Sequence, residues 1–371
     1  MMAQSDTEEL RTMVREVLAE IYTPEALRSA VEGAQEPIEQ LWDTAVKLSW
    51  TGIGVDERFD GAGGGIDDLA VLAAEFGRTL APTSVLVHTG VVIPAVTAQA
   101  APDHVGKLVG PLARGERRAT AGWATRGGAW SPQRPSVRAK SIDGGVVLTG
   151  EVSWVPDLVD ADDLLLLAGL EGSDEVLLLL VDVTSRDVRS IAQLDLTRRY
   201  GSCTFDGSEV PAERVLGVLD DVAVQQLVAN AATWVAIDSA AAAEAVTADA
   251  VTHAKSRHQF GRAIGSFQAV KHTLAEMYCH AREARALAEV AIDVAGTAEA
   301  SRLASLAKAQ CADSYATVAG DAVQMFGGIG FTWEHHAHLH VRRARANQAL
   351  YGSSSWHRER AAQTLLGNTD P

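Results

Sequence analysis

Apolar residues recur every three or four positions from about residue 6 to residue 115, a period typical of amphipathic helices. Thr23-Pro24 predicts a helix start, because proline is favoured at the first helical position. The glycine-rich loop 61–65 leads to Asp67-Asp68, which can cap a further helix. No Lys-Ser or Lys-Thr follows these glycines, so a plain connector is favoured over a phosphate-binding loop.

From about residue 118 to residue 215 the pattern changes to that of β-strands. Alternating segments at 135–142 and 146–155 are separated by Asp143-Gly144-Gly145, a strong hairpin signal. Two leucine-rich runs, 163–169 and 175–183, are short and fully apolar, which predicts strands buried on both faces. We expect Pro211 to end the β region.

Beyond about residue 220 the chain is again predicted to be helical, in longer units. The apolar stretch 222–246 contains Gln225, Asn230, Asp238 and Glu244, which favours a buried helix over a membrane span. The predicted organisation is α+β: an N-terminal all-α domain over 1–116, a central β domain over 117–216, and a C-terminal α-helical bundle over 217–371.

Composition narrows the function. The net charge of −16 argues against a nucleic-acid-binding protein, which needs a basic field. The three cysteines, Cys203, Cys279 and Cys311, lack CxxC spacing, which predicts a reduced, cytoplasmic compartment and no zinc site. The acidic, amphipathic amino terminus is unlike a signal peptide.

Residues 257–268, RHQFGRAIGSFQ, lie between two predicted long helices and combine groups suited to a dinucleotide. Arg257 and Arg262 can bind pyrophosphate, Gly261 permits close approach, and aromatic and amide side chains can contact the remainder. An ordinary helix–turn–helix corner with solvated arginines is the alternative. A second motif runs from Gln324 through Gly327-Gly328 to Glu334, where a helix stop exposes backbone amides beside an amide side chain.

The two motifs in this order resemble those of the acyl-CoA dehydrogenase family. The resemblance covers nearly the whole chain, including residues 41–65, 148–168 and 205–217. It implies an N-terminal helical domain, a central β domain and a C-terminal four-helix bundle. It also implies FAD as cofactor and α,β-dehydrogenation of an acyl-CoA thioester, in which a carboxylate removes the α proton and hydride passes to the flavin.

The resemblance implies that one subunit grips the ADP half of the FAD that is seated in its dimer mate. The residues at the matching positions here are Arg257, Gln259, Phe260, Gly261, Ile264, Phe267, Gln268, Gln324, Gly327 and Gly328.

The family's catalytic base is missing. Aligned on Gln348 and Gly352, Tyr351 stands where the family usually carries a glutamate, and a phenol is a poor base at neutral pH. Some members carry the glutamate on the helix before the first motif, and Ala231 occupies that position. Asp238 and Glu244 lie further along that helix, where a polar helix position is favoured over a base.

The β domain also departs from the family where flavin and thioester would meet the sheet. In residues 124–131 only Thr125 and small residues match. Trp154 can flank a flavin ring or belong to the core, but Pro156 replaces a threonine and offers flavin N5 neither hydroxyl nor N–H. The groups that act on a neighbour's FAD are thus retained, whereas those that build this chain's own centre are lost.

The leading hypothesis is a subunit of a heteromeric acyl-CoA dehydrogenase, α2β2 in composition, that completes its partner's FAD site and lacks the catalytic glutamate. The resemblance makes bulky acyl-CoA substrates, such as those with steroid side chains, plausible. The alternatives are a self-sufficient homotetrameric dehydrogenase with an atypical base, and a structural or binding paralogue without flavin turnover.

Overall fold

The computed structural model describes residues 4–366 and begins with a group of helices. These helices are α1 (Gln4–Ile21), α2 (Pro24–Val31), α3 (Glu36–Lys47), α4 (Ile66–Arg78), α5 (Val85–Val87), α6 (Ile93–Gln99) and α7 (Pro102–Ala113). Helix α2 starts at Pro24, as predicted, and Thr23 caps it, because the Thr23 hydroxyl accepts a hydrogen bond from the backbone N–H of Ala26 at 3.2 Å. A π-helical turn, His88–Val92, joins α5 to α6.

The capping prediction for Asp67-Asp68 is correct only in part. Helix α4 starts at Ile66, one residue before this pair, so both carboxylates lie in its first turn. Asp68 accepts a hydrogen bond from the backbone N–H of Gly65 at 2.9 Å, and it therefore supports the helix start from inside.

The middle of the chain forms one eight-stranded sheet with the order β6-β7-β3-β2-β4-β5-β8, and β1 pairs with β4. The strands are β1 (Ala119–Gly122), β2 (Arg138–Ile142), β3 (Gly145–Val155), β4 (Asp163–Leu170), β5 (Val176–Asp182), β6 (Asp187–Ser190), β7 (Gly201–Pro211) and β8 (Val215–Leu219). The predicted hairpin lies between β2 and β3, where Ile142 pairs with Gly145.

The expectation that Pro211 ends the β region is wrong. Proline ends only β7, because it cannot continue the hydrogen-bonded ladder. The chain then returns as β8, which pairs antiparallel with β5, with Val176 opposite Leu219.

The leucine-rich strands are buried on both faces, as predicted. In β4, Leu165 and Leu167 belong to the core shared with the N-terminal helices, whereas Leu164 and Leu166 belong to a second core on the other face. The alternation has a period of two, so each strand supplies both cores.

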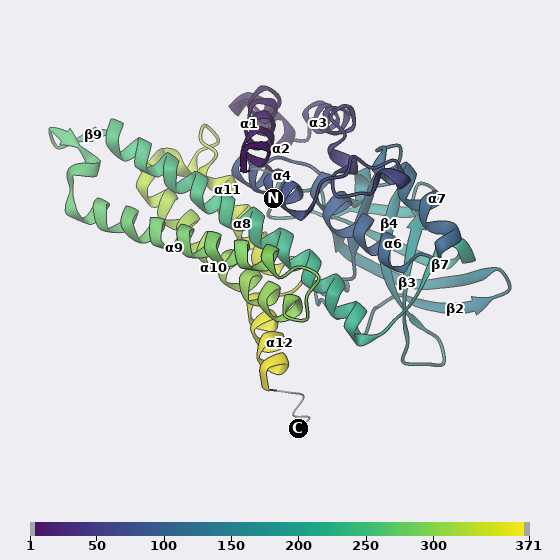
Figure 1. Cartoon of the computed structure of the whole chain (residues 1–371). Coiled ribbons are helices and arrows are strands. Elements are labelled where there is room, and N and C mark those ends of the chain that lie inside the picture. The colour runs from purple at the N-terminus through teal and green to yellow at the C-terminus, as the bar shows by residue number, and fades with distance from the viewer. Residues whose placement is uncertain (1–3, 367–371) are drawn as a thin grey trace.

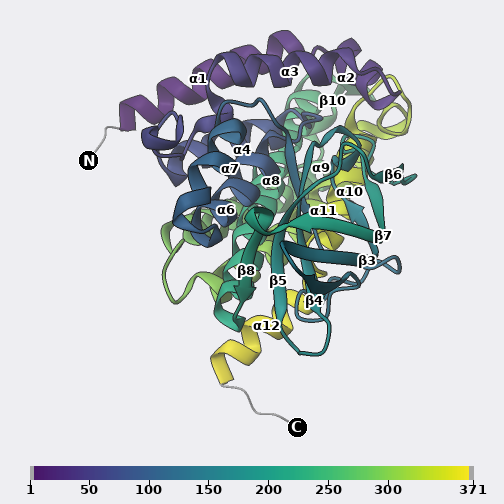
Figure 2. The ribbon, with the colours of Figure 1, turned by 90° about the vertical axis from the view of Figure 1, so that its right-hand side faces the viewer.

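The remainder is helical: α8 (Asp221–Ser256), α9 (Gln268–Asp293), α10 (Ala300–Phe326), α11 (Ala337–Ala349) and α12 (Ser354–Leu366). Helix α10 packs against the four others, and alanines at most of the contact positions allow close approach. Figure 1 shows α8, α9 and α10 extending side by side away from the sheet, and Figure 2 shows the sheet in front of them with α1, α2 and α3 across the top. The α+β fold expected from the sequence is confirmed.

No helix within residues 4–366 is both long and apolar enough to cross a membrane.

Candidate functional site

The segment between α8 and α9 forms a two-stranded hairpin and not a simple corner. Strand β9 (His258–Gln259) pairs with β10 (Arg262–Ala263) across a two-residue turn. Phe260 and Gly261 occupy this turn with φ angles of +52° and +78°, the left-handed pair that a type I′ hairpin requires. Figure 1 shows the hairpin at the end of the helices farthest from the sheet.

Most residues of the hairpin are exposed to solvent. The Phe260 side chain is 91% exposed, and its ring meets that of Phe267 edge to face at a centroid separation of 6.1 Å. The Arg262 guanidinium lies 4.1 Å from the Phe267 ring centroid. Arg257, Gln259 and Gln268 are exposed as well, and Ile264 is half-buried. A cation, amides and aromatic faces are therefore presented together to a molecule outside the described chain.

The second motif lies at the same end of the molecule. Helix α10 stops at Phe326, and Gly327, at φ +65°, donates its N–H to the carbonyls of Gln324 and Val323. Gln324, Gly327 and Gly328 are exposed. The Phe326 ring lies 5.1 Å from that of His253 in the last turn of α8, so the packing holds the two motifs together. We call the hairpin 257–268 together with residues 324–328 the clamp.

Thr125 and Trp154 lie apart from the clamp, at the sheet. The Thr125 hydroxyl accepts a hydrogen bond from the backbone N–H of Ala129 at 3.2 Å, and Trp154 Nε1 donates to the Arg126 carbonyl at 3.3 Å. Trp154 has a φ of +56°, a strained conformation for a bulky residue. The predicted cofactor residues thus form two separate groups, one in the clamp and one at the sheet.

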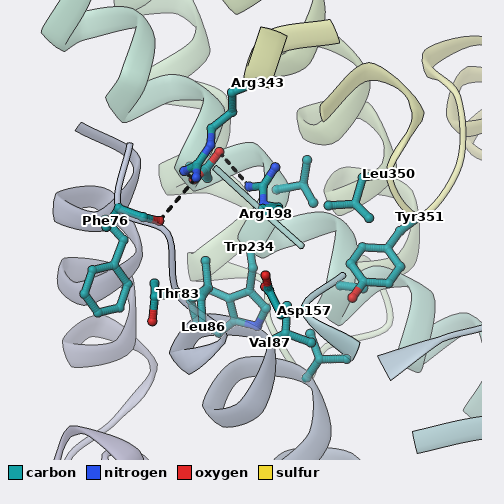
Figure 3. Close-up of a pocket in the computed structure, with 15 residues that line it drawn as sticks. Phe76, Thr83, Leu86, Val87, Asp157, Arg198, Trp234, Arg343, Leu350 and Tyr351 are labelled. Carbon is teal, nitrogen blue, oxygen red and sulfur yellow. Dashed lines mark hydrogen bonds and ion pairs between the residues drawn. The ribbon is translucent and has the colours of Figure 1, made fainter. Parts of the chain in front are cut away.

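The two positions at which the resemblance places the catalytic base, Ala231 and Tyr351, line the same cavity. It contains about 490 Å³ of empty space, part of it open to solvent. Figure 3 shows Trp234 and Asp157 on one side and Tyr351 on the other, with Arg198 and Arg343 above. The walls are otherwise mainly apolar. Neither base position supplies a carboxylate.

Tyr351 belongs to a compact cluster of three aromatic rings. Its ring centroid is 5.1 Å from that of Trp123 and 5.0 Å from that of Trp130. The Tyr351 hydroxyl donates to the Ala121 carbonyl at 3.1 Å, and burial raises the pKa of this phenol well above its ordinary value. We call Trp123, Trp130 and Tyr351 the aromatic cluster. It fills space with apolar surface, and its phenol cannot act as a base near neutral pH.

The turn that carries Tyr351 is fixed from inside the bundle. Tyr351 and Gly352 have φ angles of +56° and +122°. The buried Lys308 Nζ donates to the carbonyls of Gln348, at 3.0 Å, and Gly352. His357, also buried, lies 3.2 Å from the Tyr351 carbonyl. Side chains of α10 and α12 therefore hold the strained turn that follows α11.

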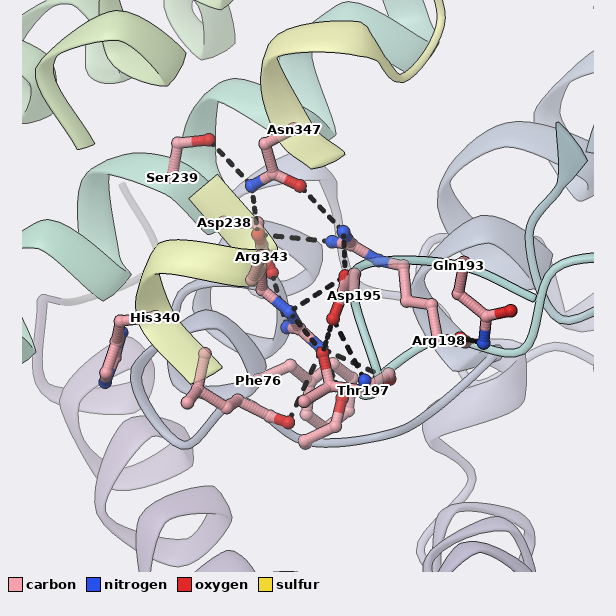
Figure 4. A network of polar contacts seen from close by, with 12 residues as sticks. Phe76, Gln193, Asp195, Thr197, Arg198, Asp238, Ser239, His340, Arg343 and Asn347 are labelled. Carbon is pink, nitrogen blue, oxygen red and sulfur yellow. Dashed lines mark hydrogen bonds and ion pairs between the residues drawn. The ribbon is translucent and has the colours of Figure 1, made fainter. Parts of the chain in front are cut away.

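A network of buried charged side chains forms one wall of the cavity (Figure 4). Asp238 Oδ1 accepts from Arg343 at 3.1 Å, and Oδ2 accepts from Arg198 at 3.2 Å. Asn347 donates to Asp238 at 2.7 Å and accepts from Arg198 at 2.7 Å. Burial alone would raise the pKa of Asp238, but the guanidinium groups of Arg343 and Arg198 hold it below its ordinary value. Both carboxylate oxygens of Asp238 therefore already accept hydrogen bonds.

One carboxylate of the cavity retains an unoccupied oxygen. Asp157 is 5% exposed and has a φ of +52°. Its Oδ1 accepts from the backbone N–H of Arg199 at 3.0 Å, whereas Oδ2 has no hydrogen-bond partner within the described residues. Burial raises its pKa to about 6, against that hydrogen bond and the nearby Arg198 guanidinium.

The sequence did not identify the charged network, Asp157 or the aromatic cluster as site residues. Asp195 and Arg198 are three residues apart, but Asp238 and Arg343 come from two other parts of the chain and meet them only through the fold. The one signal in the sequence for the aromatic cluster was that Trp123 and Trp130 lie close together, although aromatic residues make up only 5% of the chain.

Among residues 4–366, no group of three histidine, cysteine, aspartate or glutamate side chains is placed to hold a metal ion.

Comparisons with known proteins agree on one family. The model of the acyl-CoA dehydrogenase N-terminal domain matches residues 4–116, and that of the acyl-CoA dehydrogenase C-terminal domain matches residues 221–366. The acyl-CoA dehydrogenase FadE34 of Mycobacterium tuberculosis is 36% identical over 325 residues, which are 86% of this chain and 41% of FadE34. This chain therefore spans less than half of that relative. The acyl-CoA dehydrogenase IpdE2 of the same organism is 29% identical over 93% of this chain and 94% of its own.

Solved structures show the same fold. A chain of the ChsE4-ChsE5 complex from Mycobacterium tuberculosis superposes with a TM-score of 0.90, at 21% identity and 99% coverage of both chains. A variant of the Tcur3481-Tcur3483 steroid ACAD superposes with a TM-score of 0.86, at 24% identity and 98% coverage of both chains.

Proposed function

Because the chain belongs to the acyl-CoA dehydrogenase family, whose members bind FAD, we propose that it is the subunit of a heteromeric acyl-CoA dehydrogenase that completes the FAD site of its partner. The partner supplies the catalytic base, the isoalloxazine pocket and the acyl pocket. This chain supplies the clamp for the ADP half.

A single observation carries the proposal: Tyr351, at one base position, is buried in the aromatic cluster, and alanine stands at the other. α-Proton removal requires a base whose pKa lies near the working pH. A phenol with a raised pKa, hydrogen-bonded to the Ala121 carbonyl, does not meet this requirement. Pro156, where flavin N5 would need a donor, points to the same conclusion.

The clamp residues suit a dinucleotide held by another chain. The Arg257 guanidinium can pair with pyrophosphate oxygens, and Phe260 and Phe267 offer faces for stacking. Gly327 and Gly328 carry no side chain, so the backbone can approach the ligand; a Cβ at either would meet no atom of this chain within 4 Å. When bound, FAD supplies the hydride acceptor. This chain's residues bind and orient its ADP half.

Two structural neighbours carry names that give two chains together. ChsE4-ChsE5 is named as a complex, and Tcur3481-Tcur3483 is named as a steroid ACAD. These names support a heterotetramer of two pairs of unlike subunits here, with an acyl-CoA substrate that carries a bulky or steroid side chain.

The proposed function can be tested by purifying this chain alone and together with the product of a neighbouring gene. We expect the complex to bind FAD and to reduce a ferrocenium acceptor with an acyl-CoA, and the chain alone to do neither. Turnover by the chain alone would contradict the proposal. Failure to bind flavin with any partner would favour the structural paralogue.

Asp157 supports a second candidate, the self-sufficient dehydrogenase. It lines the cavity that holds both base positions, its Oδ2 is unoccupied, and a pKa of about 6 suits a general base. In that case the chain alone would dehydrogenate an acyl-CoA, and Asp157→Asn would abolish the activity without loss of bound FAD. Asp157 stands at neither of the two base positions that the resemblance gives, which makes this the weaker candidate.

A further inference from the structure

A group of histidines lies directly beneath the clamp. His253 is on α8, and His335, His336, His338 and His340 are in or just before α11. The His335 and His336 rings stack at 4.7 Å, and the His336 and His340 rings are 5.7 Å apart. We call these five residues the histidine cluster. The cofactor-binding role assigned above to the clamp makes no use of it.

The histidine cluster joins the two halves of the clamp. The His335 ring packs on Phe326 at 4.1 Å, and Phe326 packs on His253 at 5.1 Å. Phe326 directly precedes Gly327, and His253 lies four residues before Arg257. Any movement of His335 away from Phe326 therefore alters the relative position of the glycine turn and the arginine hairpin.

In the arrangement seen in this structure, two of the histidine rings are placed to accept hydrogen bonds and are therefore neutral. His335 Nδ1 accepts a hydrogen bond from the backbone N–H of Ala337 at 3.0 Å, which is possible only while that nitrogen carries no proton. His340 Nδ1 lies 2.8 Å from the buried Tyr315 hydroxyl, which can donate to it. A proton on His335 Nδ1 would replace a hydrogen bond with a repulsive contact between two N–H groups.

The charged groups around the histidine cluster include both anions and cations, and the cations are more numerous. Helix α8 contributes Asp249, whose Oδ2 is 3.1 Å from His336 Nε2, and the nearby Arg257. Arg28 of α2 and Glu334 line a cavity beside these rings. Helix α11 contributes Arg342 and Arg343. Burial and then the neighbouring His336 lower the pKa of His335 to about 4, although Asp249 opposes this. Burial also lowers the pKa of His253, His338 and His340.

We propose that the histidine cluster makes the grip of the clamp proton-dependent: the clamp is closed while the rings are neutral, and it opens and releases the dinucleotide when they take up protons. This rests on the proposed role of the clamp in binding the partner's FAD. Protonated rings would also attract pyrophosphate, which favours tighter binding. Opening prevails because His335 can accept its proton only after the contact with Ala337 is broken.

This proposal can be tested by measuring, with flavin fluorescence, how much FAD the assembled complex releases between pH 7.5 and pH 5.5. We expect the dissociation constant to rise about tenfold on acidification, because His335 in the open clamp would have the ordinary imidazole pKa of about 6.5, above its pKa of about 4 in the closed clamp. In His335→Asn, whose side-chain oxygen can still accept from Ala337 N–H but cannot be protonated, the rise should be less than about threefold. His335→Phe, which keeps the ring on Phe326, should flatten the profile similarly. His104→Asn, on α7 and away from the clamp, should behave as wild type.

A pH profile that is the same in wild type, His335→Asn and His335→Phe would overturn the inference, as would tighter binding of FAD at pH 5.5. Arg257→Ala, measured in parallel, separates this failure from a failure of the clamp itself. If Arg257→Ala loses FAD at pH 7.5, the clamp stands and only its proton dependence is refuted.

Discussion

The clamp and the cavity that holds the two base positions differ in how far their residues are exposed. At the clamp, Arg257, Gln259, Phe260 and Gly261 are exposed to solvent. In the cavity, Tyr351 is buried, and its ring packs against Trp123 and Trp130. The groups of the first region are therefore available to a ligand, whereas most groups of the second contact other parts of this chain.

The difference separates groups that are available to a ligand from groups that the fold holds in place. Strained turns occur at Trp154, Asp157 and Tyr351. Hydrogen bonds hold two of them: Lys308 donates to the Gly352 carbonyl next to Tyr351, and the Arg199 backbone N–H donates to Asp157.

The largest effect is expected from the charged wall of the cavity. Asp238→Ala would leave Arg198 and Arg343 buried with too few counter-charges, so we expect a loss of about 3–5 kcal/mol in the free energy of unfolding. Denaturant unfolding measures it. Asp187→Ala, which breaks an exposed pair with Arg189, should cost no more than about 0.5 kcal/mol. A stable Asp238→Ala variant that is merely inactive would indicate that Asp238 is a base.

At the clamp, Arg257→Ala should weaken FAD binding by the complex about 10- to 100-fold, because one charge-assisted contact to pyrophosphate is lost. Equilibrium dialysis of FAD against the purified complex measures the change. Arg189→Ala, an exposed arginine on β6, is the matched control. Unchanged FAD content in Arg257→Ala would refute the clamp assignment.

Asp157→Asn should stabilise the protein at pH 7.5. The folded pKa of about 6 lies above the ordinary 3.8, so the folded state binds more protons between these values and stability falls as pH rises through them. Above pH 6 the ionised Asp157 therefore costs on the order of 1–3 kcal/mol, which asparagine avoids. Melting temperatures should differ most at pH 7.5 and converge near pH 4. A destabilised variant at pH 7.5 would show that the ionised form is favoured.

The smallest effect is expected from Tyr351→Phe. It removes the hydrogen bond to Ala121 but keeps the ring in the aromatic cluster, so stability should fall by about 0.5–1.5 kcal/mol. Turnover by the complex should be nearly unchanged, as measured with an acyl-CoA and a ferrocenium acceptor. A loss of turnover greater than tenfold would make this hydroxyl part of the catalytic machinery.

Much of the fold could be predicted from local signals. Period and turn chemistry identified the helices, the β2–β3 hairpin and the buried strands β4 and β5. Strand β8 was missed because Pro211 gives a strong local stop, whereas the pairing of Val215–Leu219 with β5 is a tertiary contact.

The clamp residues could be grouped from the sequence because they lie within two short segments, and their role in binding FAD stays a prediction. The cavity residues could not be grouped in this way. The sequence identified Ala231 and Tyr351 at the two base positions, but not the packing of Tyr351 against Trp123 and Trp130. Asp195, Arg198, Asp238 and Arg343 come from three parts of the chain, and no periodicity links them. The free oxygen of Asp157 likewise follows from burial, which a sequence position alone does not reveal.

The number of FAD molecules in the purified complex tests the central claim most directly. If this chain clamps its partner's dinucleotide and has no flavin pocket of its own, native mass spectrometry should find one FAD for each pair of unlike chains. Two FAD molecules for each pair would contradict the account, since this chain would then hold a flavin beside the aromatic cluster.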